Sequence, residues 1–315
     1  PFPLGRLMAW KALFWALVGG TMAALAFAGV WLFAPWPSNT GILGLGLLAV
    51  LGAVATACLA VAMGSNAADL SDDRRPVVGL STVWLFMITA ALFNTAISGE
   101  GQIRVRALLL YGMGVALHWM TGMENLARAY DPEHRGARRI LPGDGATLAI
   151  LLYLGQRVVS MAASPASSLG PAVWSGILLI FAASLLHRAS CSRPPRGLLA
   201  SVVVALVAGA AGAQIFPPSL SPSSWDLSAV ALVVGCIAEE VIVRGLLQRA
   251  LSERWPGLRG QVTALLISTA VAWLVGRSSL SFVSVVTAAT GAAVWAATRR
   301  TWGAVLARFL LVLLP

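Results

Sequence analysis

Long apolar runs separated by short polar segments dominate the chain. A bilayer-spanning helix needs about 20 predominantly apolar residues. The pattern therefore predicts an all-α fold, a polytopic transmembrane helical bundle of about ten or eleven spans. We expect the last run to be truncated at the C-terminus. The expected spans cover residues 9–34, 41–64, 77–97, 105–122, 146–163, 171–187, 197–216, 227–247, 261–276, 280–297 and 302–314.

The composition supports a membrane protein and argues against a soluble domain. Of the 315 residues 58% are hydrophobic and 11% charged, and the mean hydropathy is +0.82. The net charge of +10 comes almost wholly from arginines in short loops between apolar runs, where they meet lipid headgroups. We therefore expect membrane lipid, and no nucleic acid, as a partner. Cys58, Cys191 and Cys236 are too far apart for a zinc motif, so we expect no metal site and no cofactor.

Basic residues alternate between the loops and predict the orientation. They occupy segments 6–11, 74–75, 128–139, 188–196, 249–259 and 299–300, whereas segments 35–40, 164–171 and 217–225 have none. Because cytoplasmic loops carry the excess of arginine and lysine, we expect a cytoplasmic N-terminus in the inner or plasma membrane. Arg104, Arg106 and Arg277 depart from this alternation.

The longest polar segment between spans predicts the domain boundary. Residues 124–145 are expected to form a cytoplasmic loop. Residues 1–123 would be N-terminal transmembrane helices of unknown role, and residues 146–315 a second transmembrane domain.

Three charged residues interrupt the apolar run 227–247. Each ionised group at the centre of a bilayer helix costs ~2.5 to 3.5 kcal/mol, so Glu239, Glu240 and Arg244 indicate a polar function. Glu240 and Arg244 are four residues apart and share a helix face, where we expect them to pair. Glu239 points about 100° away, and we expect it to face a polar cavity. The alternative is an ion pair that only holds two helices together.

The motif resembles the EExxxR signature of the CPBP family, the CAAX proteases and bacteriocin-processing membrane endopeptidases. Residues 245–249, 266–273 and 302–307 resemble segments that follow the signature in that family. The resemblance implies an intramembrane glutamic endopeptidase fold in which Glu239 is the general base. It implies that Glu240 and Arg244 are a supporting pair.

Two departures from the family pattern affect catalysis. Gly276 and Arg308 align with the two histidines of the family, and no histidine follows His187. Loss of one oxyanion donor typically lowers the rate by ~10² to 10³. Arg308 can stabilise an oxyanion as a permanent cation but cannot relay a proton. The sequence leaves open an active endopeptidase and a catalytically impaired relative that binds membrane protein or peptide substrates.

Two residues of earlier spans are candidates to support the site. His118 lies in the fourth span and Arg157 in the fifth. An unpaired arginine inside a membrane is so unfavourable that we expect Arg157 to pair with Glu239 or Glu240.

A second chemistry is suggested by two acidic loops, at residues 66–73 and 124–131. They are similar to the aspartate-rich loops of UbiA-type intramembrane prenyltransferases, which implies Mg²⁺ and a diphosphate substrate held by Asp69, Asp73 and Asp131. The second loop has Ala127 where that family has an acidic residue. We therefore expect Asp69 and Asp131 to be far apart or to face solvent.

Overall fold

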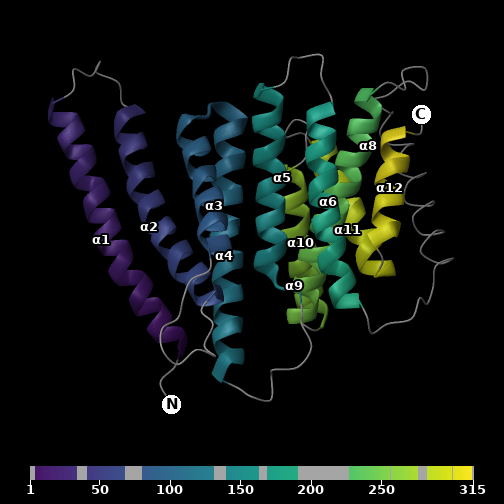
Figure 1. Cartoon of the computed structure of the whole chain (residues 1–315), viewed down its shortest axis with the longest axis horizontal. Helices are drawn as coiled ribbons and strands as arrows, with labels where there is room; N and C mark the ends of the chain where they lie inside the picture. The colour runs from purple at the N-terminus through teal and green to yellow at the C-terminus, as the bar shows by residue number, and fades with distance from the viewer. Residues whose placement is uncertain are drawn as a thin grey trace. The chain divides into compact units, whose positions relative to one another are not determined.

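The computed structural model describes residues 4–33, 41–67, 80–130, 140–162, 169–190, 227–255, 257–275, 282–299 and 301–313. These residues are helical apart from short connections, and they contain no strand. Contacts divide the chain into two compact units, Pro1–Ala137 and Arg138–Pro315. The helices of each unit are labelled in Figure 1.

The described part of the N-terminal unit consists of the helices α1 (Leu4–Phe33), α2 (Gly41–Ala67), α3 (Leu80–Ser98) and α4 (Gly101–Tyr130). Helix α2 packs against the other three. Its glycines allow this, because an added Cβ would lie 2.4 Å from the Phe27 ring at Gly46 and 1.8 Å from the Phe93 ring at Gly52.

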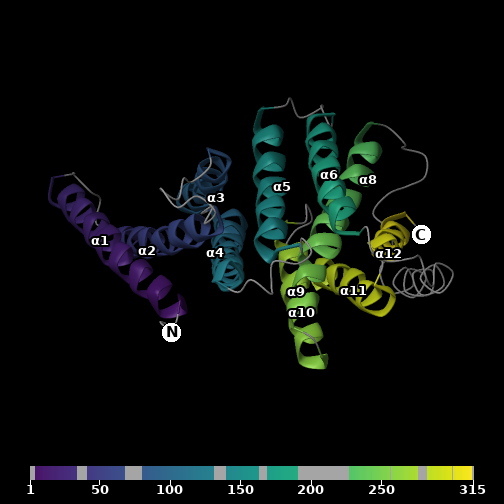
Figure 2. The same ribbon diagram turned by 60° about the horizontal axis from the view of Figure 1, so that its bottom comes forward.

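The C-terminal unit is built around a π-helix, η2 (Val241–Gln248), which continues α8 (Leu227–Glu240) and leads into α9 (Arg249–Arg254). Among the described residues, η2 also contacts each of the remaining helices of this unit, which are α5 (Pro142–Ala162), α6 (Leu169–Ser190), α10 (Leu258–Val275), α11 (Phe282–Thr298) and α12 (Thr301–Leu313). Figure 2 separates α10 and α11 from α5 and α6, which overlap them in Figure 1.

Helices α5 and η2 approach each other backbone to backbone. A Cβ added at Gly145 would lie 2.9 Å from the Cα and the amide nitrogen of Leu247. Only glycine fits at this position without a shift of one helix, because the atoms it would meet are main-chain atoms. Residues 242–248 of η2, including its one charged residue, Arg244, are buried.

The helices confirm the predicted fold class, an all-α helical membrane bundle. Each predicted span within the described residues corresponds to a helix, and span 197–216 lies outside them. Three helices of the described part, at Gly5–Leu32, Gly44–Ser65 and Leu258–Val275, are long and apolar enough to cross a membrane.

Large apolar side chains on α1 face outward, among them Trp10, which is 68% exposed. An exposed apolar surface of this kind fits an integral membrane protein.

Both ends of the predicted loop range, residues 124–145, are helical in the structure. Residues 124–130 extend α4, and α5 already begins at Pro142. Proline is favourable at the first helical position. The amide of Leu141 donates to Asp144 Oδ2 at 3.3 Å, and the amide of Asp144 donates to the Leu141 carbonyl at 3.1 Å, which closes the first turn of α5. The boundary between the two units falls inside the predicted loop range.

Candidate functional site in the C-terminal unit

The charged motif lies where an α-helix changes into a π-helix. Helix α8 ends at Glu240, and the chain continues through Arg244 in η2 without a break. The sequence predicts one continuous α-helix through this region, and the π-helical turns were not predicted. No proline marks the change. Segments of π-helix are rare and are frequently found at functional sites.

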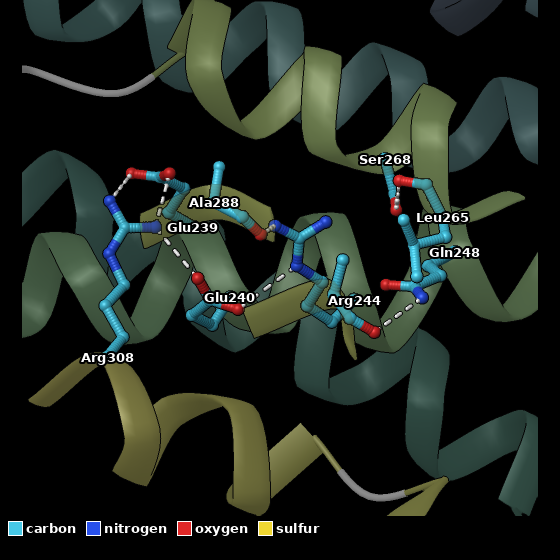
Figure 3. Close-up of polar contacts among 9 residues, drawn as sticks. Glu239, Glu240, Arg244, Gln248, Leu265, Ser268, Ala288 and Arg308 are labelled. Carbon is cyan, nitrogen blue, oxygen red and sulfur yellow. Dashed lines mark hydrogen bonds and ion pairs between the residues drawn. The ribbon is translucent and has the colours of Figure 1, made fainter. Parts of the chain in front are cut away.

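Two glutamates and two arginines meet at this junction (Figure 3). Arg244 Nε donates to Glu240 Oε2 at 3.3 Å, which confirms the predicted pairing. Arg308 donates to both oxygens of Glu239, through Nη1 at 2.5 Å and Nη2 at 2.9 Å. Its Nη1 also donates to Glu240 Oε1 at 2.8 Å. We call Glu239, Glu240, Arg244 and Arg308 the ion quartet.

The ion quartet is buried and balanced in charge. The exposed fractions of its side chains are 0% for Arg244, 1% for Glu240, 7% for Glu239 and 13% for Arg308. Ionised groups inside a protein are tolerated when they are paired and hydrogen-bonded. Here two carboxylates face two guanidinium groups, so the formal charges sum to zero. Removing any one member would leave a buried charge without its counterion.

Helix α11 supports the motif through its main chain. Arg244 Nη2 donates to the carbonyl oxygen of Ala288 at 2.6 Å, and Gln248 Nε2 donates to that of Ala292 at 3.1 Å. Between them lies Gly291, where an added Cβ would be 3.0 Å from Glu240 Oε2. Small residues of α11 therefore let the polar side chains of η2 reach its backbone.

Sequence reasoning missed this contact with α11. One signal was present, because Glu240, Arg244 and Gln248 recur at four-residue intervals. This spacing places them along one side of a helix.

The cation that bridges the two glutamates is Arg308 of α12. The expected pairing of Arg157 of α5 with Glu239 or Glu240 stays a prediction. The side chain of Glu239 is 7% exposed, and Arg308 donates to both of its oxygens. The polar cavity expected beside Glu239 stays a prediction. His118 is a buried residue of α4 in the N-terminal unit, and its role stays a prediction. Gly276 lies outside the described residues.

The described residues contain no cluster of three or more histidine, cysteine or acidic side chains that could hold a metal ion. Asp69, Asp73 and Asp131, which the transferase alternative requires, lie outside the described residues. The expectation for these aspartates therefore stays a prediction.

Comparison with known protein families finds a match for the segment that contains the ion quartet. Residues 221–314 match the family model of the type II CAAX prenyl endopeptidases, Rce1-like. This segment is similar to the CPBP family. The similarity predicted from the EExxxR motif is thus confirmed for the segment that holds all four members of the ion quartet. No curated protein and no solved structure matches the chain significantly.

Proposed function

We propose that this protein is a catalytically impaired, CPBP-type intramembrane protein that binds membrane protein or peptide substrates through its C-terminal unit. The family match over residues 221–314 supports the endopeptidase type of fold. The observation that carries the impairment is the two-point contact of Arg308 with Glu239.

This contact opposes general-base catalysis for a geometric reason. A general base must lie within hydrogen-bond reach of the water that it deprotonates. Both oxygens of Glu239 already accept hydrogen bonds from Arg308, and the side chain is only 7% exposed. Arginine keeps its proton, so Arg308 cannot replace a histidine in proton transfer. Gly276 supplies no side-chain donor at the other histidine position.

An active endopeptidase is the competing function. In that mechanism Arg308 would move from Glu239 to the developing oxyanion, and Glu239 would then activate a water. A permanent cation beside the glutamate pair supports this candidate, because stabilising developing charge is a large part of catalysis in acyl transfer.

Peptide cleavage by the full chain in lipid bilayers distinguishes the two functions. The wild type would be compared with Glu239→Ala, with Gly276→His plus Arg308→His, and with Glu253→Ala as a control. Glu253 is also paired with an arginine four residues away, but its side chain is 36% exposed. We expect negligible cleavage by the wild type, Glu239→Ala and the control. Robust wild-type cleavage that Glu239→Ala abolishes and the control retains would contradict the impairment.

The expected setting is part of the proposal. The protein would lie in the inner or plasma membrane with a cytoplasmic N-terminus, in contact with lipid and with membrane protein or peptide substrates. The excess of arginine in alternate loops supports this orientation.

A further inference from the structure

Arg308 is the most accessible member of the ion quartet. Its side chain is 13% exposed, followed by Glu239 at 7%, whereas Glu240 and Arg244 are 1% and 0% exposed. Arg244 is further fixed by the carbonyl oxygen of Ala288. A molecule that approaches the ion quartet therefore meets the pair of Arg308 and Glu239 first.

The contact between Arg308 and Glu239 is one that another carboxylate can reproduce. A guanidinium group presents parallel N–H donors that match the two oxygens of any carboxylate. Nη1 and Nη2 of Arg308 use this geometry on Glu239, while Nη1 also reaches Glu240. If Glu239 left, Glu240 would still hold Arg308 in place, and two donors would face an incoming anion.

We propose that the ion quartet is the closed state of a carboxylate-binding site, in which Arg308 exchanges Glu239 for the carboxylate of an apolar ligand. The inference rests on the proposed binding function and names its ligand class. The ligand is apolar apart from its carboxylate, because the site lies among membrane helices. A peptide C-terminus and a fatty acid both have this chemistry.

The exchange has a proton balance that can be measured. The four charges of the ion quartet sum to zero, and a bound carboxylate would add one negative charge. Neutrality is restored if Glu239 takes up one proton, supplied by the ligand acid or by solvent. The charged groups that face Glu239 are Glu240 and Arg244 on its own helical segment and Arg308 on α12. Binding of an ionised carboxylate should therefore take up one proton.

Calorimetry on the full chain in lipid nanodiscs tests the exchange. The probes are an apolar peptide with a free C-terminal carboxylate, the same peptide with a C-terminal amide, a fatty acid and the matching fatty amide. We expect each acid to bind about tenfold or more tightly than its amide, since a charge-assisted two-point contact is lost in the amide. A preference confined to the peptide pair or to the fatty pair identifies the source of the carboxylate.

Two variants move the affinity in opposite directions. Glu239→Gln removes the competing carboxylate and should tighten binding of the acids. Arg308→Gln should make acid and amide bind alike. Because Arg308→Gln leaves unbalanced buried charge, the charge-balanced double variant Glu239→Gln plus Arg308→Gln is the second test, and it should fold and show the same loss of preference.

The proposal is overturned if the wild type binds acid and amide alike, if it binds neither, or if Glu239→Gln weakens binding of the acids. A purely structural ion quartet would give no tightening in Glu239→Gln. Mass spectrometry of the peptide after each titration keeps the two proposals apart. Cleaved peptide contradicts the catalytic impairment, whereas intact peptide with no preference for the acid contradicts only the exchange.

Discussion

Arg308 and Glu239, 69 residues apart in the chain, are joined by two hydrogen bonds of 2.5 and 2.9 Å. The pair links α12 to the end of α8. It places a permanent cation at the position that the CPBP resemblance assigns to a histidine. The same contact that occupies both oxygens of Glu239 also balances its charge inside the protein. Under the proposed function, Arg308 therefore stabilises the site and opposes catalysis at the same time.

Loss of Arg308 should destabilise the protein strongly. Arg308→Met leaves two buried glutamates with Arg244 as their remaining partner in the ion quartet, and breaking a buried pair typically costs ~3 to 5 kcal/mol. The double variant Glu239→Met plus Arg308→Met restores the charge balance and should recover most of this loss. Chemical denaturation in mild detergent measures the free energy of unfolding of each variant.

The control for this series is the exposed ion pair of Arg249 and Glu253, in which Arg249 Nε lies 3.0 Å from Glu253 Oε1. Exposed ion pairs contribute ~0 to 1 kcal/mol, so Glu253→Ala should change stability little. A double variant that is no more stable than Arg308→Met would contradict the view that charge balance holds this site together.

Gly291→Ala should disturb the contact between η2 and α11. The new methyl group would lie 3.0 Å from Glu240 Oε2, and overpacking of this kind costs ~1 to 3 kcal/mol. Gly176→Ala on α6 is the matched control, because an added Cβ there meets nothing within 4 Å. The control should gain up to ~1 kcal/mol from helix propensity. Equal stabilisation of both variants in thermal melts would show that Gly291 does not hold the two helices close.

The fold could be predicted from the sequence to a large extent, because hydrophobic length alone specifies membrane helices. The pairing of Glu240 with Arg244 followed from their four-residue spacing. The partner of Glu239 did not follow, because Arg308 is brought to it by packing of α12 on α8. A contact between residues so far apart in the chain leaves no local signal.

The π-helix shows a second limit of sequence reasoning. Val241–Gln248 has the composition of an ordinary apolar helix, and its altered hydrogen bonding was not predicted. The site side chains of this segment reach main-chain carbonyls of α11, which are the same for every residue type. Such contacts cannot be recognised by searching for complementary side chains.

The predicted orientation can be tested by cysteine labelling. In a background with Cys58, Cys191 and Cys236 replaced by serine, Arg193→Cys should be protected from a membrane-impermeant maleimide in intact cells, and Ser38→Cys should be labelled. The reason is that segment 188–196 is basic whereas segment 35–40 has no basic residue. After the membrane is permeabilised, both positions should react. The reverse pattern in intact cells would place the N-terminus on the other side.

The transferase alternative requires a Mg²⁺ site built from aspartates, which the ion quartet does not require. A prenyltransferase needs its aspartates to gather Mg²⁺ around the diphosphate, because the charge of the leaving group must be neutralised as it departs. The second acidic loop has Ala127 where that chemistry requires an acid, and Ala127 is an exposed residue near the end of α4. We therefore expect no Mg²⁺-dependent binding of an isoprenyl diphosphate, either by the wild type or by Asp69→Asn. Equilibrium dialysis with a radiolabelled diphosphate, with and without Mg²⁺, measures this. Tight Mg²⁺-dependent binding that Asp69→Asn and Asp131→Asn both abolish would move the chemistry to the acidic loops and leave the ion quartet with a structural role.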